Sequence, residues 1–231
     1  MSTTSATVDG FAAQIRAAST AAHEGAEHSA FLDALASGRL DPSGAAAYTA
    51  QLFFVYQALE GAAGTAADDP VARRFVFPEL ARRASLECDL EVMLGSAWRG
   101  TISPSGATSA YVARIEDVAH TWPGGYVAHA YTRYLGDLSG GRAIRRWVRQ
   151  SLGTDGDAGT SFYDFPGIAS PAQFKDEFRA RLDAVTWSPL ERSRVIDEVL
   201  LAYRHNTALL LELGARVHEW ARPASSTAAS A

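Results

Sequence analysis

The chain has 231 residues, 47% of them hydrophobic and 20% charged, and a formal net charge of −5. This length and composition predict one globular domain with a sizeable core, and the acidic balance argues against nucleic acid as the main partner, because nucleic-acid binding normally requires a basic face. The one cysteine, Cys88, excludes an intramolecular disulfide and a cysteine-based metal cluster, and it favours a reducing, cytoplasmic setting.

The first part of the chain reads as a series of helices. Residues 1–8 are small and polar, with no apolar leader, and are expected to be flexible. Apolar residues then recur with helical spacing over residues 9–28, where Asp9 is a candidate N-cap, and over 29–37, which end at Gly38. Asp41-Pro42-Ser43 predicts the start of a long helix that reaches about Ala63, before a polar loop at 64–70.

The rest of the chain continues in the same way. We expect helices over 78–95, around 111–118 and, after a turn at 122–125, over about 125–149; two more begin at Pro171 and at Ser188-Pro189, and the last reaches about Trp220. Residues 222–231 predict a disordered tail. We find neither the alternation of a strand nor an uninterrupted apolar run of about 18 residues, so we expect no membrane anchor. The predicted fold is all-α, one domain over residues 9–221 with about eight helices.

Glycines interrupt the helix predicted over 125–149. Each of Gly136, Gly140 and Gly141 should cost roughly 1 kcal/mol against Ala in a helix. Gly136 and Gly140 lie four residues apart, so they form a bare stripe where a flat ligand could contact the backbone. Their spacing is equally compatible with a Gly-rich turn that breaks the helix, or with close packing of two helices.

Among the six histidines, His23 has the most informative neighbours. Arg16 precedes it by seven residues and Glu27 follows it by four, so a cation, an imidazole and a carboxylate share one helical stripe. His129 competes with it, since it lies seven residues before Gly136 on nearly the same stripe. A lone helical histidine is more often a surface or satisfied side chain than a ligand.

Two segments resemble the haem oxygenases. The run Ala130-Tyr131-Thr132-Arg133-Tyr134-Leu135-Gly136-Asp137-Leu138-Ser139-Gly140-Gly141 resembles their distal-helix signature, and His23-Glu24-Gly25-Ala26-Glu27 with Arg16 resembles their proximal helix. The likeness covers roughly residues 14–215, including 162–170, and is weakest at 64–77 and 95–107. It implies haem b (iron protoporphyrin IX) sandwiched between a proximal helix and a glycine-kinked distal helix, with His23 as the iron ligand, Glu27 orienting its ring, and His129 as a bystander.

The resemblance also assigns the residues around the haem. Arg16, Tyr131, Lys175 and Arg179 match the positions that hold the propionates, which implies attack at the α-meso carbon; without the family context, Lys175 and Arg179 read as a solvated basic face. Gly136, Gly140 and Tyr203 match haem-contacting positions, and Tyr203 is often Phe in the family. Arg16 stands where many members have Lys, and Arg204-His205 where mammalian-type members are apolar.

A polar network is implied on the distal side. Tyr56, Thr132, Arg133, Asp137 and Asn206 match the family's residues around an ordered water, with Asp137 as the anchor of a proton relay. The alternative for Asp137 is an ordinary ion pair with Arg133, four residues earlier. From sequence alone, core packing is an equally good interpretation of Tyr56.

The implied function is degradation of haem, with O2 and external electrons, to biliverdin, carbon monoxide and ferrous iron. The alternative is a haem-binding, storage or transfer protein on the same scaffold; a purely structural helical domain would leave Gly136 and Gly140 unexplained. Arg142, Arg145, Arg146 and Arg149 form a basic ridge. Most such runs are solvated faces, but we hypothesise that this one docks an acidic ferredoxin, a flavodoxin or an NAD(P)H-dependent reductase.

Overall fold

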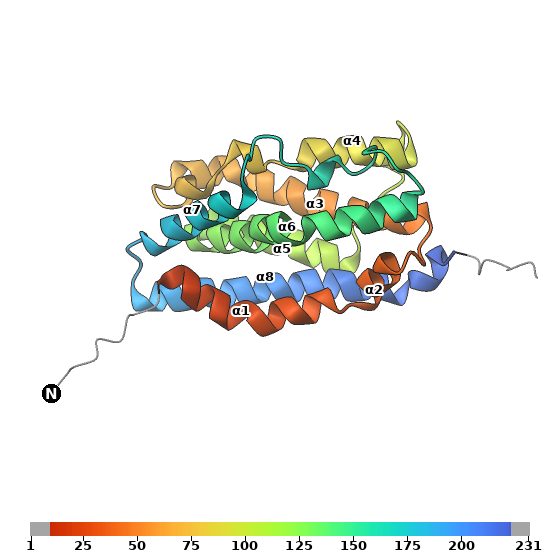
Figure 1. The fold of residues 1–231 in the computed structure, drawn as a ribbon. Helices are drawn as coiled ribbons and strands as arrows, with labels where there is room; N and C mark the ends of the chain where they lie inside the picture. The colour runs from red at the N-terminus through yellow and green to blue at the C-terminus, as the bar shows by residue number, and fades with distance from the viewer. Residues whose placement is uncertain (1–9, 223–231) are drawn as a thin grey trace, which may run out of the picture.

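The computed structural model describes residues 10–222, and the described chain is all-α, as predicted (Figure 1). The predicted N-cap Asp9, the N-terminus 1–8 and nearly all of the tail 222–231 lie outside the described residues. Eight α-helices occur in the described part: α1 (Phe11–Glu27), α2 (Ala30–Ala36), α3 (Pro42–Asp68), α4 (Arg83–Leu94), α5 (Gly106–Thr121), α6 (Pro123–Leu152), α7 (Pro171–Asp183) and α8 (Pro189–Ala215).

Several helices begin where the sequence predicts, because a polar side chain accepts the first free backbone N–H groups. Asp41 accepts from the N–H of Ser43 at 2.8 Å, directly before Pro42. Ser188 accepts from the N–H of Glu191 at 3.1 Å, directly before Pro189. Such a cap satisfies donors that the helix itself leaves unpaired, so residues adjacent to these boundaries determine them.

Two predicted boundaries are wrong, and for the second a contact between helices is the reason. α3 continues to Asp68, so most of the loop predicted at 64–70 is helical. Pro78 starts only a short 3₁₀ turn, Pro78–Leu80, and α4 begins at Arg83. The backbone N–H groups of Arg82 and Arg83 donate to Glu60 of α3 at 2.5 and 3.0 Å, so a side chain from another helix caps α4.

The turn predicted at 122–125 is also wrong, because α6 already begins at Pro123. Gly124 and Gly125 lie in its first turn, where α5 and α6 meet. A Cβ atom at Gly125 would lie 2.6 Å from Cβ of Val118, so only glycine fits there. α6 then stays helical through Gly136, Gly140 and Gly141 to Leu152. The last predicted helix is shorter than expected, since α8 stops at Ala215 and Val217–Trp220 is a 3₁₀ turn.

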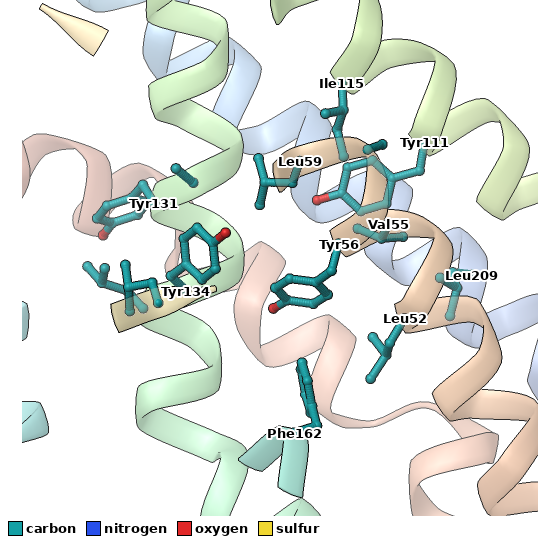
Figure 2. Close-up of a cluster of buried hydrophobic side chains, with 14 of the residues drawn as sticks. Leu52, Val55, Tyr56, Leu59, Tyr111, Ile115, Tyr131, Tyr134, Phe162 and Leu209 are labelled. Carbon is teal, nitrogen blue, oxygen red and sulfur yellow. The ribbon is translucent and has the colours of Figure 1, made fainter. Parts of the chain in front are cut away.

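The helices form layers, with α6 between them (Figure 1). α1 and α8 pack side by side below α6, and α3 packs on its other side with α4 against it. α5 lies beside α6 and contacts α3, α6 and α8. Aromatic rings fill the contact between α3 and α6: Tyr56 lies 5.1 Å from Phe162 and 5.8 Å from Tyr134, between ring centroids (Figure 2). Within residues 10–222, every helix is too short or too polar to cross a membrane.

Candidate functional site

A cavity of about 480 Å³ opens between α1 and α6, with α7 and α8 completing its wall. It is lined by Arg16, Ser19, Thr20, His23, Glu24, Tyr131, Leu135, Gly136, Ser139, Lys175, Arg179 and Tyr203. The predicted iron ligand, the predicted propionate-binding residues and one of the glycines therefore border the same space.

A smaller cavity of about 110 Å³ shares three of these residues, His23, Gly136 and Tyr203. Its remaining lining residues come from α2, α3, α6 and α8: Leu32, Tyr48, Thr132, Arg133, Asp137, Gly140, Ile144, Asn206 and Leu210. The two cavities together border both predicted glycine positions and most of the predicted distal network.

His23 projects from α1 toward the glycine segment of α6. Its ring is half-buried and contacts Tyr203 of α8 edge to face, with centroids 6.0 Å apart. The competing candidate, His129, lines neither cavity; it is fully buried, and its Nε2 lies 3.0 Å from Oε1 of Glu198. The structure thus separates the two histidines, and of the two only His23 borders these cavities.

The glycines on α6 are not explained by protein packing. A Cβ atom at Gly136 or Gly140 would meet no atom within 4 Å beyond the local helix backbone, in contrast to Gly125. The helix is unbroken here, so neither a turn nor close helix packing accounts for them. Both positions face cavity space opposite an imidazole, and this arrangement fits a flat iron macrocycle held between His23 and bare backbone.

The predicted distal network is largely assembled. The Tyr56 hydroxyl donates to Asp137, and Arg133 donates to Oδ1 of Asn206 at 2.6 Å and to Oδ1 of Asp137 at 3.4 Å. Arg133 Nε also lies 3.4 Å from the Tyr56 hydroxyl. Tyr56 is also core packing, as Figure 2 shows, so its two interpretations coexist.

Asp137 does more than form an ordinary ion pair with Arg133. Its side chain is only 11% exposed, and partners on α3 and α6 surround it. Burial raises the pKa of Asp137 well above its usual range. A carboxyl group whose protonated form is favoured by burial therefore borders the smaller cavity.

Thr132 is the exception within the network. It borders the smaller cavity, but its hydroxyl donates to the backbone carbonyl of Ala128 at 2.9 Å. Its predicted part in the polar network stays a prediction. The side chain of Glu27 lies outside the described residues, so its predicted role also stays untested.

Cations gather at the mouth of the larger cavity. Arg16 comes from α1, whereas Lys175 and Arg179 lie one turn apart on α7. Arg179 pairs with Asp176 at 2.9 Å, and Lys175 donates to Ser139 at 3.0 Å. Burial raises the pKa of Tyr131 while Arg179 and Arg16 act to lower it, so both cations lie near its ring. This cluster could bind carboxylates.

Sequence reasoning missed several lining residues. Ile144 could have been found, because it continues the stripe of Gly136 and Gly140 by one more turn. Ser139 stands inside the distal-helix motif but has no charge or ring to single it out. Tyr48 reaches the smaller cavity from α3, and its pKa is raised to about 12 by burial, with Arg133 opposing this effect.

Comparison with known proteins places this arrangement in a family. The family model described as Heme oxygenase matches residues 9–212. The chain belongs to the haem oxygenase family. The resemblance identified from the distal-helix and proximal-helix residues is thereby confirmed.

Relatives in this family match most of the chain. Heme oxygenase of Pyropia yezoensis is 37% identical over 206 residues, which are 89% of this chain and 87% of that protein. Heme oxygenase 1 of Synechocystis sp. is 35% identical over 202 residues, 87% of this chain and 84% of that protein.

Solved structures of haem oxygenases share the fold. Synechocystis heme oxygenase-1 in complex with heme has a TM-score of 0.86 at 34% identity, covering 91% of this chain and 95% of that one. Heme oxygenase from Leptospira interrogans has a TM-score of 0.83 at 31% identity, covering 88% and 100%.

Proposed function

We propose that this chain degrades haem, using O2 and electrons from an external donor, and releases biliverdin, carbon monoxide and ferrous iron. The observation that carries the proposal is the cavity in which His23 faces bare glycine backbone, with the buried carboxyl group of Asp137 behind it. Bound haem supplies both the iron that activates O2 and the carbon that is oxidised. Membership of the family favours degradation over storage or transfer of haem.

His23 holds the iron from the α1 side through one ring nitrogen. On the α6 side, Gly136 and Gly140 leave room for a small molecule between helix and macrocycle, because they carry no side chain. Asp137 is the group that exchanges a proton near this space, since burial raises its pKa, and Tyr56 and Arg133 fix its orientation through hydrogen bonds. A storage protein would have no need for this buried, protonatable group.

The mouth cations orient the macrocycle. Arg16, Lys175 and Arg179 bind the propionates, with Tyr131 alongside. Holding both propionates at the mouth leaves one fixed edge of the ring pointing inward. We take the α-meso carbon to be the one placed beside the distal helix, in keeping with the match to the family's propionate positions.

The electron donor docks on the exposed part of the basic ridge. Arg145 and Arg149 pair with Asp157 at 3.0 and 3.6 Å, so this carboxylate partly neutralises their positive charge. Arg142 and Arg146 are exposed, with no carboxylate partner among the described residues. An acidic ferredoxin, flavodoxin or reductase would complement them. We also propose a cytoplasmic location for the protein, because its single cysteine favours a reducing compartment.

Two variants test the proposal. Purified His23→Ala should bind hemin with a changed ligand-field spectrum, because its iron ligand is lost. Asp137→Ala should still bind hemin through His23 but form no biliverdin when supplied with ascorbate or a reductase system in air. Biliverdin formation at the wild-type rate by Asp137→Ala would refute the assigned proton-holding role, and unchanged spectra of His23→Ala would refute the assigned ligand.

A further inference from the structure

Lys175 is chemically unique in this chain. It is the only lysine among the 21 Lys and Arg residues. An ammonium group is a compact charge on a flexible stem, whereas the planar guanidinium of arginine binds carboxylates in a fixed geometry. A lysine that must bind at a defined place therefore needs a neighbour to hold it.

Ser139 of α6 is that neighbour. Lys175 Nζ donates to Ser139 Oγ at 3.0 Å, and Ser139 in turn donates to the backbone carbonyl of Leu135 at 2.7 Å. The hydroxyl proton is thus committed to the helix, which leaves the oxygen lone pairs directed at the ammonium group. Both side chains line the larger cavity, and Ser139 lies between Gly136 and Gly140 in the sequence.

Burial and Arg179 disfavour the charged form of Lys175, which the contact with Ser139 supports. The side chain is half-buried; burial lowers its pKa, Arg179 lowers it further, and Asp176 opposes the shift. Asp176 is engaged by Arg179 at 2.9 Å, and Lys175 has no ion pair with a carboxylate among residues 10–222. An oxygen acceptor favours the charged form of a lysine, so Ser139 supports the ammonium that the neighbouring groups disfavour.

We propose that Ser139 is a positioning residue that holds the Lys175 ammonium at the cavity mouth for one haem propionate and so fixes the orientation of the macrocycle. This inference rests on the proposed function, since it takes haem as the ligand. Ser139 acts through Lys175 and has no role in proton delivery. Its loss therefore changes how haem is held, not the chemistry at the distal helix.

Hemin titrations of a double-mutant cycle test the inference. Ser139→Ala should weaken hemin binding about fivefold, because a charge-assisted contact at a partly exposed site loses its preorganisation. Ser139→Thr should restore wild-type affinity, since it keeps the hydroxyl. In a Lys175→Ala background, Ser139→Ala should have no further effect. An equal loss in both backgrounds would show a direct role of Ser139 and overturn the inference.

Hemin dimethyl ester isolates the propionate charge. Ser139→Ala should leave affinity for the ester unchanged, because no carboxylate is present for Lys175 to bind. Thr121→Ala is the matched control: it removes a hydroxyl with the same backbone bond, 2.7 Å to the carbonyl of Asp117, at an exposed site remote from the haem cavity. The control should match wild type with both ligands. A comparable loss for hemin and its ester in Ser139→Ala would contradict the inference.

The single lysine also allows a readout without haem. Reductive methylation with 13C-formaldehyde labels Lys175 and the N-terminal amine, whose different pKa values separate their NMR signals. Ser139→Ala should lower the pKa of Lys175, and an unchanged value would overturn the proposed contact. Failure of wild type to bind hemin would refute the proposed function itself, whereas normal binding with no Ser139 effect would refute this inference alone.

Discussion

At the scale of single residues, the candidate site depends on side chains that different helices bring together. Asp137 and Arg133 lie on α6, but their partners Tyr56 and Asn206 come from α3 and α8. The burial of Asp137 follows from this convergence, and burial is what raises its pKa. The raised pKa of Asp137 is therefore a property of the folded chain and does not follow from the residues adjacent to it in the sequence.

Asp137→Asn should separate haem binding from turnover. The amide keeps the size of the side chain and can still accept from Tyr56, but it cannot take up and release a proton. We expect hemin affinity close to wild type and a biliverdin formation rate reduced about 100-fold, as for loss of a general acid or base. Asp117→Asn, at an exposed pair with Arg114, should behave as wild type. Parallel loss of binding in Asp137→Asn would argue for a structural role instead.

Residue identity predicted much of this site, but only through resemblance. Spacing alone could not choose between His23 and His129, since His23 shares a helical stripe with Arg16 while His129 lies on nearly the same stripe as Gly136. A physical reason to set His129 aside appears only in the structure, where its ring is buried and contacts Glu198. Ser139 could not be predicted from its neighbours in the chain, because its importance comes from Lys175, 36 residues away on another helix.

At the scale of elements, α6 combines two kinds of glycine. Gly125 lets α5 and α6 approach, since a Cβ atom there would lie 2.6 Å from Val118. Gly136 and Gly140 have free space around them and weaken the helix without helping it pack. Composition cannot distinguish the two kinds, because the difference lies in what faces each glycine.

Gly136→Ala should stabilise the haem-free protein and weaken haem binding. The new methyl group gains about 0.5–1 kcal/mol of helix stability, because the glycine no longer has to be ordered from a freer unfolded state. The same methyl group projects toward the haem cavity, so hemin affinity should fall at least about tenfold. This corresponds to a loss of about 1.4 kcal/mol.

Gly64→Ala in α3 is the matched control for Gly136→Ala, since its Cβ atom would also meet nothing within 4 Å. It should raise the melting temperature in the same way and leave hemin affinity unchanged. Equal hemin affinity in both variants would mean that Gly136 does not face the ligand.

Reversing the exposed charges of the ridge tests donor docking. Arg142→Glu with Arg146→Glu should raise the Michaelis constant for an acidic ferredoxin and flatten its dependence on salt, because long-range attraction is lost. Turnover with ascorbate, which needs no docking surface, should stay at the wild-type rate. Donor kinetics identical to wild type would remove the ridge from the docking surface.

Helix boundaries show the same division between local and distant causes. The starts of α3 and α8 were predicted from the caps Asp41 and Ser188, and that of α7 from Pro171, which Ser170 caps in the structure. The start of α4 was mispredicted because its cap, Glu60, comes from α3. Sequence reading succeeds where the stabilising group is local and fails where it is supplied across the fold.

At the scale of the whole molecule, a buried polar cluster ties α5, α6 and α8 together. Arg114 of α5 pairs with Glu198 of α8 at 2.7 Å, and His129 of α6 lies 3.0 Å from the same carboxylate. Burial raises the pKa of Glu198, but the hydrogen bonds from His129 and Arg114 outweigh it and lower the value to about 2. Burial lowers the pKa of His129, which therefore stays neutral and donates to a carboxylate already paired with arginine.

His129 should make the haem-free protein less stable in mild acid. Because its pKa is lowered in the folded state, the unfolded chain binds more protons as pH falls below about 6.5. The contribution of His129 to the free energy of unfolding is therefore fully present above that pH. Below it, this contribution decreases by at most about 1.4 kcal/mol per pH unit. Burial also lowers the pKa of His205, so two histidines contribute in wild type.

His129→Gln can still donate to Glu198 but cannot titrate. Urea unfolding between pH 7 and 5 should therefore show a flatter pH dependence for this variant, whatever its absolute stability. A slope equal to that of wild type would mean that His129 is protonated in the folded protein.

We propose that His23, the bare glycine backbone and Asp137 together make a haem-degrading site. The most direct test is a single turnover: hemin-loaded protein receives ascorbate or a reductase system in air, with catalase present, while the Soret band is followed and the product identified. We expect the Soret band to disappear and the α isomer of biliverdin to form, unaffected by catalase. A Soret band that persists with no bilin product would show that this site binds haem without degrading it.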